Sequence, residues 1–286
     1  MITLKNHQSL VKISTSGAQI MQWRDTFISR NILWELNEEF WNRVSPILFP
    51  IVGRLKNDTY RLDETEYKMK QHGFARDLTF ETIESTQEST LLRLTSNQET
   101  REIFPFDFIF DVEYILKGCT IQVRNTVQNT GPETLYFSFG AHPGFHIEGS
   151  ISNYQLHIPG ATKMPRHLIQ DGLYTGASEI IKFEAGGILN LNDDFFKDDA
   201  IVFKNENIPS IQIWKERKPL LELSILGEPA PYWGIWRKPG APFLCLEPWW
   251  GIADSEKSDG NFTTKEGINA LLPNEKRSFD YRMTLL

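Results

Sequence analysis

The segment that decides the fold covers residues 108–127 and reads FIFDVEYILKGCTIQVRNTV. Apolar and polar side chains largely alternate on both sides of Lys117-Gly118, and this period of two is typical of half-buried β-strands. A Lys-Gly pair between two such runs is a turn signal. The segment therefore predicts two antiparallel strands joined by a tight turn.

The same pattern recurs elsewhere along the chain. Further alternating runs cover residues 210–214 and 221–225, and turn clusters stand at residues 129–132, 186–187 and 238–240. Short strands separated by glycine- and proline-rich turns are typical of an antiparallel β-protein. The sequence therefore predicts β-structure throughout most of the chain.

Two segments look helical, and both are short: residues 37–43 and part of residues 192–199. The chain contains no low-complexity linker and no internal repeat of fixed period. All-β sandwiches of this length commonly form one unit. We therefore predict an all-β fold, a large antiparallel β-sandwich with a few short helices, in which residues 1–286 form a single domain.

Composition excludes several classes of protein. The chain is 40% hydrophobic and 23% charged, as expected of a soluble globular protein with a sizeable core. Its net charge of −7 argues against a general nucleic-acid binder, which would carry a basic face. No apolar run reaches eighteen residues, and the N-terminus lacks the pattern of a secretion signal. We expect a cytoplasmic protein without membrane or nucleic-acid partners.

The chain has two cysteines, Cys119 and Cys245. Each lies in an apolar, alternating stretch, and neither has a Cys or His nearby at metal-ligand spacing. We interpret both as buried thiols rather than as partners in a disulfide or as reactive groups.

Two ionisable residues stand among small, rigid and aromatic neighbours. His142 follows a strand-like run and precedes Pro143-Gly144, where the chain must turn. Glu247 follows the apolar run 243–246, at the end of what looks like an interior strand. A carboxylate there is costly to desolvate unless it is paired or functional. The two residues are candidates for an acid and a base, and the alternatives are a structural histidine and a strand-end salt bridge.

Aromatic residues make up 12% of the chain, and four tryptophans gather near the C-terminal end: Trp233, Trp236, Trp249 and Trp250. The C–H faces of a sugar ring stack on such side chains, while its hydroxyl groups need polar partners at the rim. The alternative is that these rings simply fill the core of a large sandwich.

Four segments, taken together, resemble the aldose 1-epimerase (galactose mutarotase) family, and most closely its shorter LacX-like bacterial branch. They are residues 49–54, 72–77, 140–145 and 235–251, and they occur in the family's order. The resemblance implies a galactose mutarotase-like supersandwich whose concave face holds a sugar. It also implies an enzyme with no metal and no organic cofactor.

Carried over residue by residue, the resemblance implies that His142 is the general acid and Glu247 the general base. It assigns sugar binding to Arg54 and His72. Prototypical members also hold sugar hydroxyl groups with an aspartate in a glycine-rich context that this sequence lacks. Asp199 is the nearest candidate for that role, and its alternative interpretation is a solvated charge at a helix end.

The activity implied is interconversion of the α and β anomers of a hexose or related sugar, with a pH optimum near neutrality. Hexose 6-phosphates are an alternative substrate class, for which Arg76 or Lys238 would supply further positive charge. A non-catalytic carbohydrate-binding protein is a second alternative. A glycosidase is disfavoured because that chemistry usually requires two carboxylates. Neither the particular sugar nor the oligomeric state follows from the sequence.

A mononuclear zinc site is a further alternative, because His72, His142 and Glu247 together form a known ligand set. The spacing of these residues does not match that of the zinc peptidases, so we expect no metal in the reaction.

Overall fold

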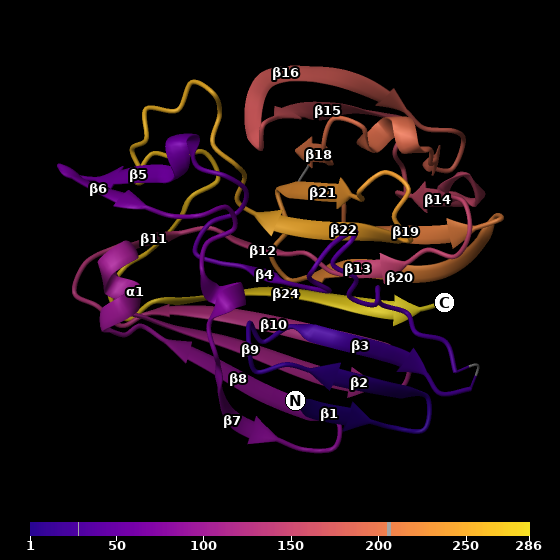
Figure 1. Ribbon diagram of the computed structural model, residues 1–286, viewed down its shortest axis with the longest axis horizontal. Helices are drawn as coiled ribbons and strands as arrows, with labels where there is room; N and C mark the ends of the chain where they lie inside the picture. The colour runs from indigo at the N-terminus through magenta and orange to yellow at the C-terminus, as the bar shows by residue number, and fades with distance from the viewer. Residues whose placement is uncertain (28, 205–206) are drawn as a thin grey trace.

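The computed structural model describes residues 1–27, 29–204 and 207–286. Within these ranges the chain is mostly β-structure, and Figure 1 shows the strands stacked in layers with short helices at their margins. Two large antiparallel sheets contain most of the strands, and three small sheets lie beside them. The predicted all-β class and antiparallel β-sandwich are confirmed.

The larger sheet consists of β7 (Glu81–Ser85), β8 (Ser89–Thr95), β9 (Phe108–Lys117), β10 (Thr120–Asn129), β14 (Tyr154–His157), β17 (Ile188–Asn190), β19 (Ser210–Lys215), β20 (Lys218–Leu226) and β24 (Lys276–Leu285). Its spatial order is β17-β14-β19-β20-β24-β10-β9-β8-β7. The C-terminal strand β24 therefore lies inside this sheet, where it pairs with β10 on one side and β20 on the other.

The second sheet consists of β4 (Ile47–Leu48), β12 (Phe139–Ala141), β13 (Gly144–His146), β15 (Lys163–Gln170), β16 (Leu173–Lys182), β18 (Ile201–Lys204), β21 (Tyr232–Trp236) and β22 (Phe243–Trp250). Its order is β16-β15-β18-β21-β22-β12-β4, and β13 also pairs with β22. Strand β22 is therefore central, with neighbours on both sides.

The small sheets join β1 (Ile2–Lys5), β2 (Ser9–Ile13) and β3 (Ile20–Asp25), β5 (Thr59–Leu62) and β6 (Thr65–Lys68), and β11 (Leu135–Phe137) and β23 (Asn269–Leu271). The helices are α1 (Gln98–Ile103) and the 3-10 turns η1 (Lys56–Asp58), η2 (Ala75–Asp77), η3 (Ile151–Asn153) and η4 (Asp193–Phe196). No helix in the described ranges is long and apolar enough to cross a membrane.

The segment 108–127 forms the predicted hairpin. Strands β9 and β10 pair antiparallel from Phe108↔Asn129 to Lys117↔Thr120. Alternate residues of β9 are buried along its whole length, as the period of two requires. Gly118 in the turn has a φ of +59°, a conformation that glycine adopts without steric cost.

The two large sheets pack face to face through aromatic side chains. The ring of Phe139 on β12 stacks on that of Phe279 on β24, with centroids 5.1 Å apart. Trp250 on β22 lies 5.3 Å from Phe279, and Phe110 on β9 contacts Phe139. Many of the aromatics noted in the sequence therefore fill the sandwich core, including Trp250.

Strand β22 is buried on both faces, because all eight of its residues are buried. Successive side chains of a strand point to opposite faces, so Glu247 and Trp249 lie on the face opposite Trp250. There Trp249 joins a second apolar cluster that includes Leu48 and Val202. Glu247 lies in the middle of the strand, not at its end as the sequence suggested.

The helical predictions were right once and wrong once. Turn η4 falls within residues 192–199, as expected. Residues 37–43 form a turn instead of a helix: Asn37 and Trp41 form an isolated antiparallel bridge, and the Asn37 side chain accepts a hydrogen bond from the Glu39 backbone N–H. This local Asn bond competes with helix formation.

Candidate active site

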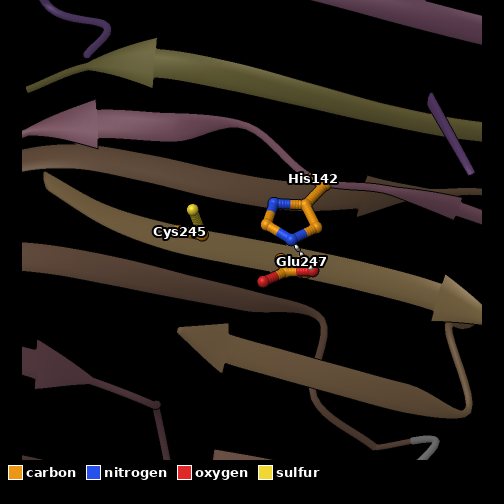
Figure 2. Close-up of side chains that lie close together, drawn as sticks. All are labelled: His142, Cys245 and Glu247. Atoms are coloured by element: carbon orange, nitrogen blue, oxygen red, sulfur yellow. Dashed lines mark ion pairs between the residues drawn. The ribbon is translucent and has the colours of Figure 1, made fainter. Parts of the chain in front are cut away.

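His142 and Glu247 lie in contact on the outer face of the second sheet. Nε2 of His142 is 3.2 Å from Oε2 of Glu247, and the side chains are 10% and 1% exposed. Figure 2 shows the imidazole ring standing over β22 with its Nε2 directed at the carboxylate. His142 reaches this position because β12 before it and β13 after it both pair with β22.

The pair opens into a cavity of about 480 Å³, a size typical of small-molecule sites. Its walls come from the turn before β4, from η2, from η4 and from strands β15, β18, β21 and β22. The lining includes Trp41, His72, Arg76, His142, Ile169, Phe196, Asp198, Asp199, Val202, Trp236, Arg237, Lys238, Glu247 and Trp249. Apolar rings and a few polar groups thus surround the His142–Glu247 pair.

Aromatic rings hold His142 in place. Its ring centroid lies 5.0 Å from that of Trp41, with the planes tilted by 32°, and 5.6 Å from that of Trp236. The ring of His72 lies edge-on at 5.7 Å. Such packing restricts the imidazole to one orientation over Glu247.

Burial shifts the pKa values of the pair in opposite directions. Desolvation lowers the pKa of His142 to about 3, and Arg76 and Arg43 add to this shift. Desolvation raises the pKa of Glu247 well above its ordinary value, and the charge of Asp199 raises it further. Both effects disfavour charge in a dry site. Burial therefore favours a neutral imidazole beside a protonated carboxyl group.

His72 is held in one tautomer. Its Nδ1 accepts a hydrogen bond of 3.1 Å from the backbone N–H of Gly53, so its Nε2 carries the proton. Burial lowers its pKa well below the ordinary value, and His142, Arg76 and Arg43 contribute. His72 is therefore a neutral hydrogen-bond donor at the wall of the cavity.

Asp199 lies at the cavity, two residues before β18. It lines the cavity wall, and its charge acts on Glu247 strongly enough to raise the pKa of that carboxyl group. Burial raises the pKa of Asp199 itself. The fold thus brings together four residues named from the sequence: His142, Glu247, His72 and Asp199.

Arg54 does not join them. Its guanidinium group forms a double hydrogen bond with Asp58 and a third bond with the carbonyl of Asp171, and its side chain is 40% exposed. It lines a neighbouring depression that shares Gln71, Gly172 and Asp199 with the main cavity, but it does not line the main cavity itself. Arg76 lines the cavity instead, with its Nε buried and without a hydrogen-bond partner.

Trp249 fills a slot made by two glycines. A Cβ on Gly140 of β12 or on Gly234 of β21 would collide with the Trp249 ring. The indole Nε1 is buried without a hydrogen-bond partner, and its N–H lies close enough to Glu247 to favour the charged carboxylate, although the geometry falls short of a hydrogen bond. The indole is therefore wedged beside the carboxylate.

Both cysteines are free, but the prediction that both are buried is right only for Cys245, since Cys119 is half-buried in the turn between β9 and β10. Cys245 lies two residues before Glu247 on the same face of β22. The potential ligand atoms of His142, Cys245 and Glu247 all lie within 4.8 Å of one another. This group, and not the set containing His72, is the potential metal-ligand cluster within the described ranges.

Sequence reasoning missed Trp41 and undervalued Arg76. Trp41 lies in a segment that looked helical, and nothing local links it to His142, one hundred residues away. Arg76 could have been found, because it follows His72 by four residues in the segment His72-Gly73-Phe74-Ala75-Arg76. Turn η2 contains Arg76 and folds it back toward the cavity.

The chain is similar to known proteins in both sequence and fold. The chain matches the model of the aldose 1-epimerase family over residues 1–179. It is 28% identical to Protein LacX (plasmid) of Lactococcus lactis subsp. lactis, over the whole of this chain and 99% of that protein.

Two solved structures share the fold over nearly their whole length. A galactose mutarotase related enzyme from Lactobacillus acidophilus is 33% identical, with a TM-score of 0.92 over 99% of this chain and 96% of that one. A galactose mutarotase-like protein from Lactobacillus casei ATCC 334 is 26% identical, with a TM-score of 0.92 over the full length of both. The chain belongs to the aldose 1-epimerase family, in its LacX-like branch.

Proposed function

We propose that this protein is an aldose 1-epimerase, which interconverts the α and β anomers of a hexose or a closely related sugar. The observation that carries the proposal is the contact of 3.2 Å between His142 and Glu247, both buried and both facing the cavity. An acid and a base held side by side suit a reaction that moves two protons without a covalent enzyme intermediate.

The chemistry requires the sugar ring to open, the C1–C2 bond to rotate and the ring to close on the other face of the aldehyde. Glu247 takes the proton of the C1 hydroxyl group, while His142 donates a proton to the ring oxygen. Both oxygens are bonded to C1, so two adjacent side chains can reach them together. On closure the two roles reverse.

The directions of the two pKa shifts support a resting pair that already holds the proton needed for this step. A neutral imidazole with a protonated carboxyl group contains the same number of protons as an imidazolium with a carboxylate. Transfer across the contact between Oε2 of Glu247 and Nε2 of His142 therefore converts the resting pair into the acid–base pair. Hydroxyl groups of the bound sugar favour the charged form, because they donate hydrogen bonds to the Glu247 oxygens, which have no hydrogen-bond partner among the described protein groups.

The remaining polar residues position the sugar. His72 donates from Nε2, and Asp199 accepts from sugar hydroxyl groups across the cavity. The rings of Trp41, Trp236 and Trp249 provide apolar surface for the C–H faces of the pyranose.

Polarimetry tests the proposal directly. Freshly dissolved α-D-galactose and α-D-glucose should reach equilibrium faster with the protein than without it. The acceleration should be lost in Glu247→Gln and in His142→Asn, while sugar affinity measured by calorimetry persists. Sugar binding without any acceleration by the native protein would instead indicate a carbohydrate-binding protein.

A second candidate substrate class is a hexose 6-phosphate. Three cationic side chains line the cavity within the described part of the chain: Arg76, Arg237 and Lys238. Burial lowers the pKa of Arg76 to about 10, a cost that a bound anion would offset. Comparing each sugar with its 6-phosphate in the same polarimetric assay separates the two classes. A gain in kcat/KM from the phosphate that disappears in Arg76→Met would identify the phosphorylated substrate.

A further inference from the structure

We propose that His142, Cys245 and Glu247 form a binding site for a thiophilic divalent cation, with Zn²⁺ as the ion of choice. Nitrogen, sulfur and oxygen ligands of this kind are those that zinc prefers. The three side chains converge from two adjacent strand segments, with Cys245 and Glu247 on β22 and His142 at the end of β12 (Figure 2).

The distances suit a tetrahedral ion. With zinc–nitrogen and zinc–oxygen bonds of about 2.0–2.1 Å, two ligand atoms at a tetrahedral centre lie roughly 3.3 Å apart. Nε2 of His142 and Oε2 of Glu247 already lie 3.2 Å apart. The sulfur lies within 4.8 Å of both ligand groups, and it needs to approach by roughly 1 Å to complete three bonds. Rotation of one side-chain bond in Cys245 produces a movement of that size.

The site also contains unsatisfied polar atoms. Both carboxylate oxygens of Glu247 and Nδ1 of His142 are buried without hydrogen-bond partners. Buried polar atoms without hydrogen bonds are costly, and coordination of a cation by Glu247 offsets part of that cost. The ligand set of one imidazole, one thiolate and one carboxylate carries two negative charges, which a divalent cation neutralises. Binding displaces the thiol proton and the carboxyl proton to solvent.

The fourth position of such an ion faces the cavity, because His142 and Glu247 line it whereas Cys245 lies behind them. A metal ion there occupies the lone pairs of the proposed acid and base. Zinc should therefore inhibit mutarotation in competition with the sugar, a consequence that rests on the proposed function. Metal binding itself does not depend on that function.

Co²⁺ spectroscopy tests the site without an activity assay. Titration of the metal-free protein with Co²⁺ should produce a thiolate-to-cobalt band in the near ultraviolet and intense visible bands of a tetrahedral ion, and Zn²⁺ should remove both. Cys119→Ala should behave like the native protein. Cys245→Ala and Cys245→Ser should lose the near-ultraviolet band and bind Zn²⁺ at least tenfold more weakly. Circular dichroism shows whether each variant is folded.

Absence of the band in the native protein, or its persistence in both Cys245 variants, would overturn the proposal. The activity measurement then separates this proposal from the previous one. Mutarotation without a cobalt band removes the metal site and leaves the proposed function intact. A cobalt band without mutarotation supports the metal site and argues against the proposed function. If both are present, Zn²⁺ should inhibit the native protein and Cys119→Ala at least tenfold more strongly than Cys245→Ala.

Discussion

His142 stands directly opposite Glu247 in a strand register that is the same on both sides of the pair. Gly140 of β12 pairs with Trp249, and Gly144 of β13 pairs with Cys245. Moving two residues inward from either pair gives His142 opposite Glu247. Pro143 and Pro248 have no backbone N–H to donate. The backbone hydrogen bonds between the two strands are therefore interrupted beside His142 and Glu247. The acid–base pair is therefore a cross-strand pair, positioned by sheet geometry.

This relationship predicts that the two residues act as a unit. Glu247→Gln and His142→Asn should each lower kcat by about 10²- to 10⁴-fold. The kcat of the double variant should be only slightly lower than that of the less active single variant. The physical reason is that ring opening requires both proton transfers, so the loss of either one already removes most of the catalysis. Polarimetric rates of the three variants check this, and multiplicative losses in the double variant would show independent roles.

Glu247→Gln should be more stable than the native protein at pH 7. The pKa of Glu247 in the folded state lies above its ordinary value of 4.5. At a pH between 4.5 and the raised pKa, the folded state therefore keeps a proton that the unfolded state releases. Stability contributed by this group therefore falls as pH rises, by about 1.4 kcal/mol for each unit of pKa elevation. Urea unfolding should show the advantage at pH 7 and its loss toward pH 4.5. Equal midpoints at both pH values would contradict the assignment.

The contribution of His142 to stability depends on pH in the opposite direction. The His142 pKa of about 3 in the folded state lies below the ordinary value of 6.5. Between these two pH values, His142 is therefore protonated in the unfolded state and neutral in the folded state. Stability contributed by His142 is full above pH 6.5 and falls as pH drops toward 3. Urea midpoints of the native protein should therefore decline more steeply between pH 6.5 and 4.5 than those of His142→Asn.

The adjacent tryptophans should separate function from stability. Trp249→Phe removes an indole N–H that favours the charged form of Glu247, so kcat should fall and the pKa of Glu247 in the pH–rate profile should rise. Trp250→Phe alters the packing against Phe279 on the opposite face. It should lower the melting temperature with kcat nearly unchanged. A pH–rate profile identical to that of the native protein in Trp249→Phe would exclude a role for this N–H.

Arg54 and Arg76 should respond differently to substitution. Arg54 is paired with Asp58 outside the cavity, whereas Arg76 lines the cavity. Arg76→Met should weaken sugar or sugar-phosphate binding by about tenfold or more, the amount typical of a lost charged hydrogen bond. Arg54→Met should change it by less than about threefold. Calorimetric titration with both variants decides between this placement and the family-based role of Arg54.

A buried ion pair lies behind the wall of the cavity, where Lys265 also donates a hydrogen bond to the carbonyl of the lining residue Ile252. Nζ of Lys265 lies 3.1 Å from Oδ1 of Asp254, and both side chains are only 4% exposed. Lys265→Met leaves the Asp254 charge buried and should cost about 3–5 kcal/mol of unfolding free energy. The exposed pair of Lys204 and Glu266 provides the control, since Lys204→Met should cost less than about 1 kcal/mol. Similar losses in the two variants would show that the Lys265 pair is solvated.

Much of the fold follows from local sequence. The hairpin of β9 and β10, the turns at residues 129–132, 186–187 and 238–240, and the antiparallel class can be read from alternation and turn residues, because these patterns act over a few positions. His142 and Glu247 could also be predicted as candidate site residues from the sequence, since each stands among glycine, proline and aromatic residues that constrain the backbone.

Tertiary structure decided the rest. The bond from Arg54 to the carbonyl of Asp171, the stacking of Trp41 on His142 and the position of Asp199 near Glu247 each join residues far apart in the chain. Distant packing also produces the burial that shifts the pKa values of the pair, and it brings Cys245 close to His142. Alternation along a strand determines which face a side chain takes, but only the packing of distant segments determines what meets it there.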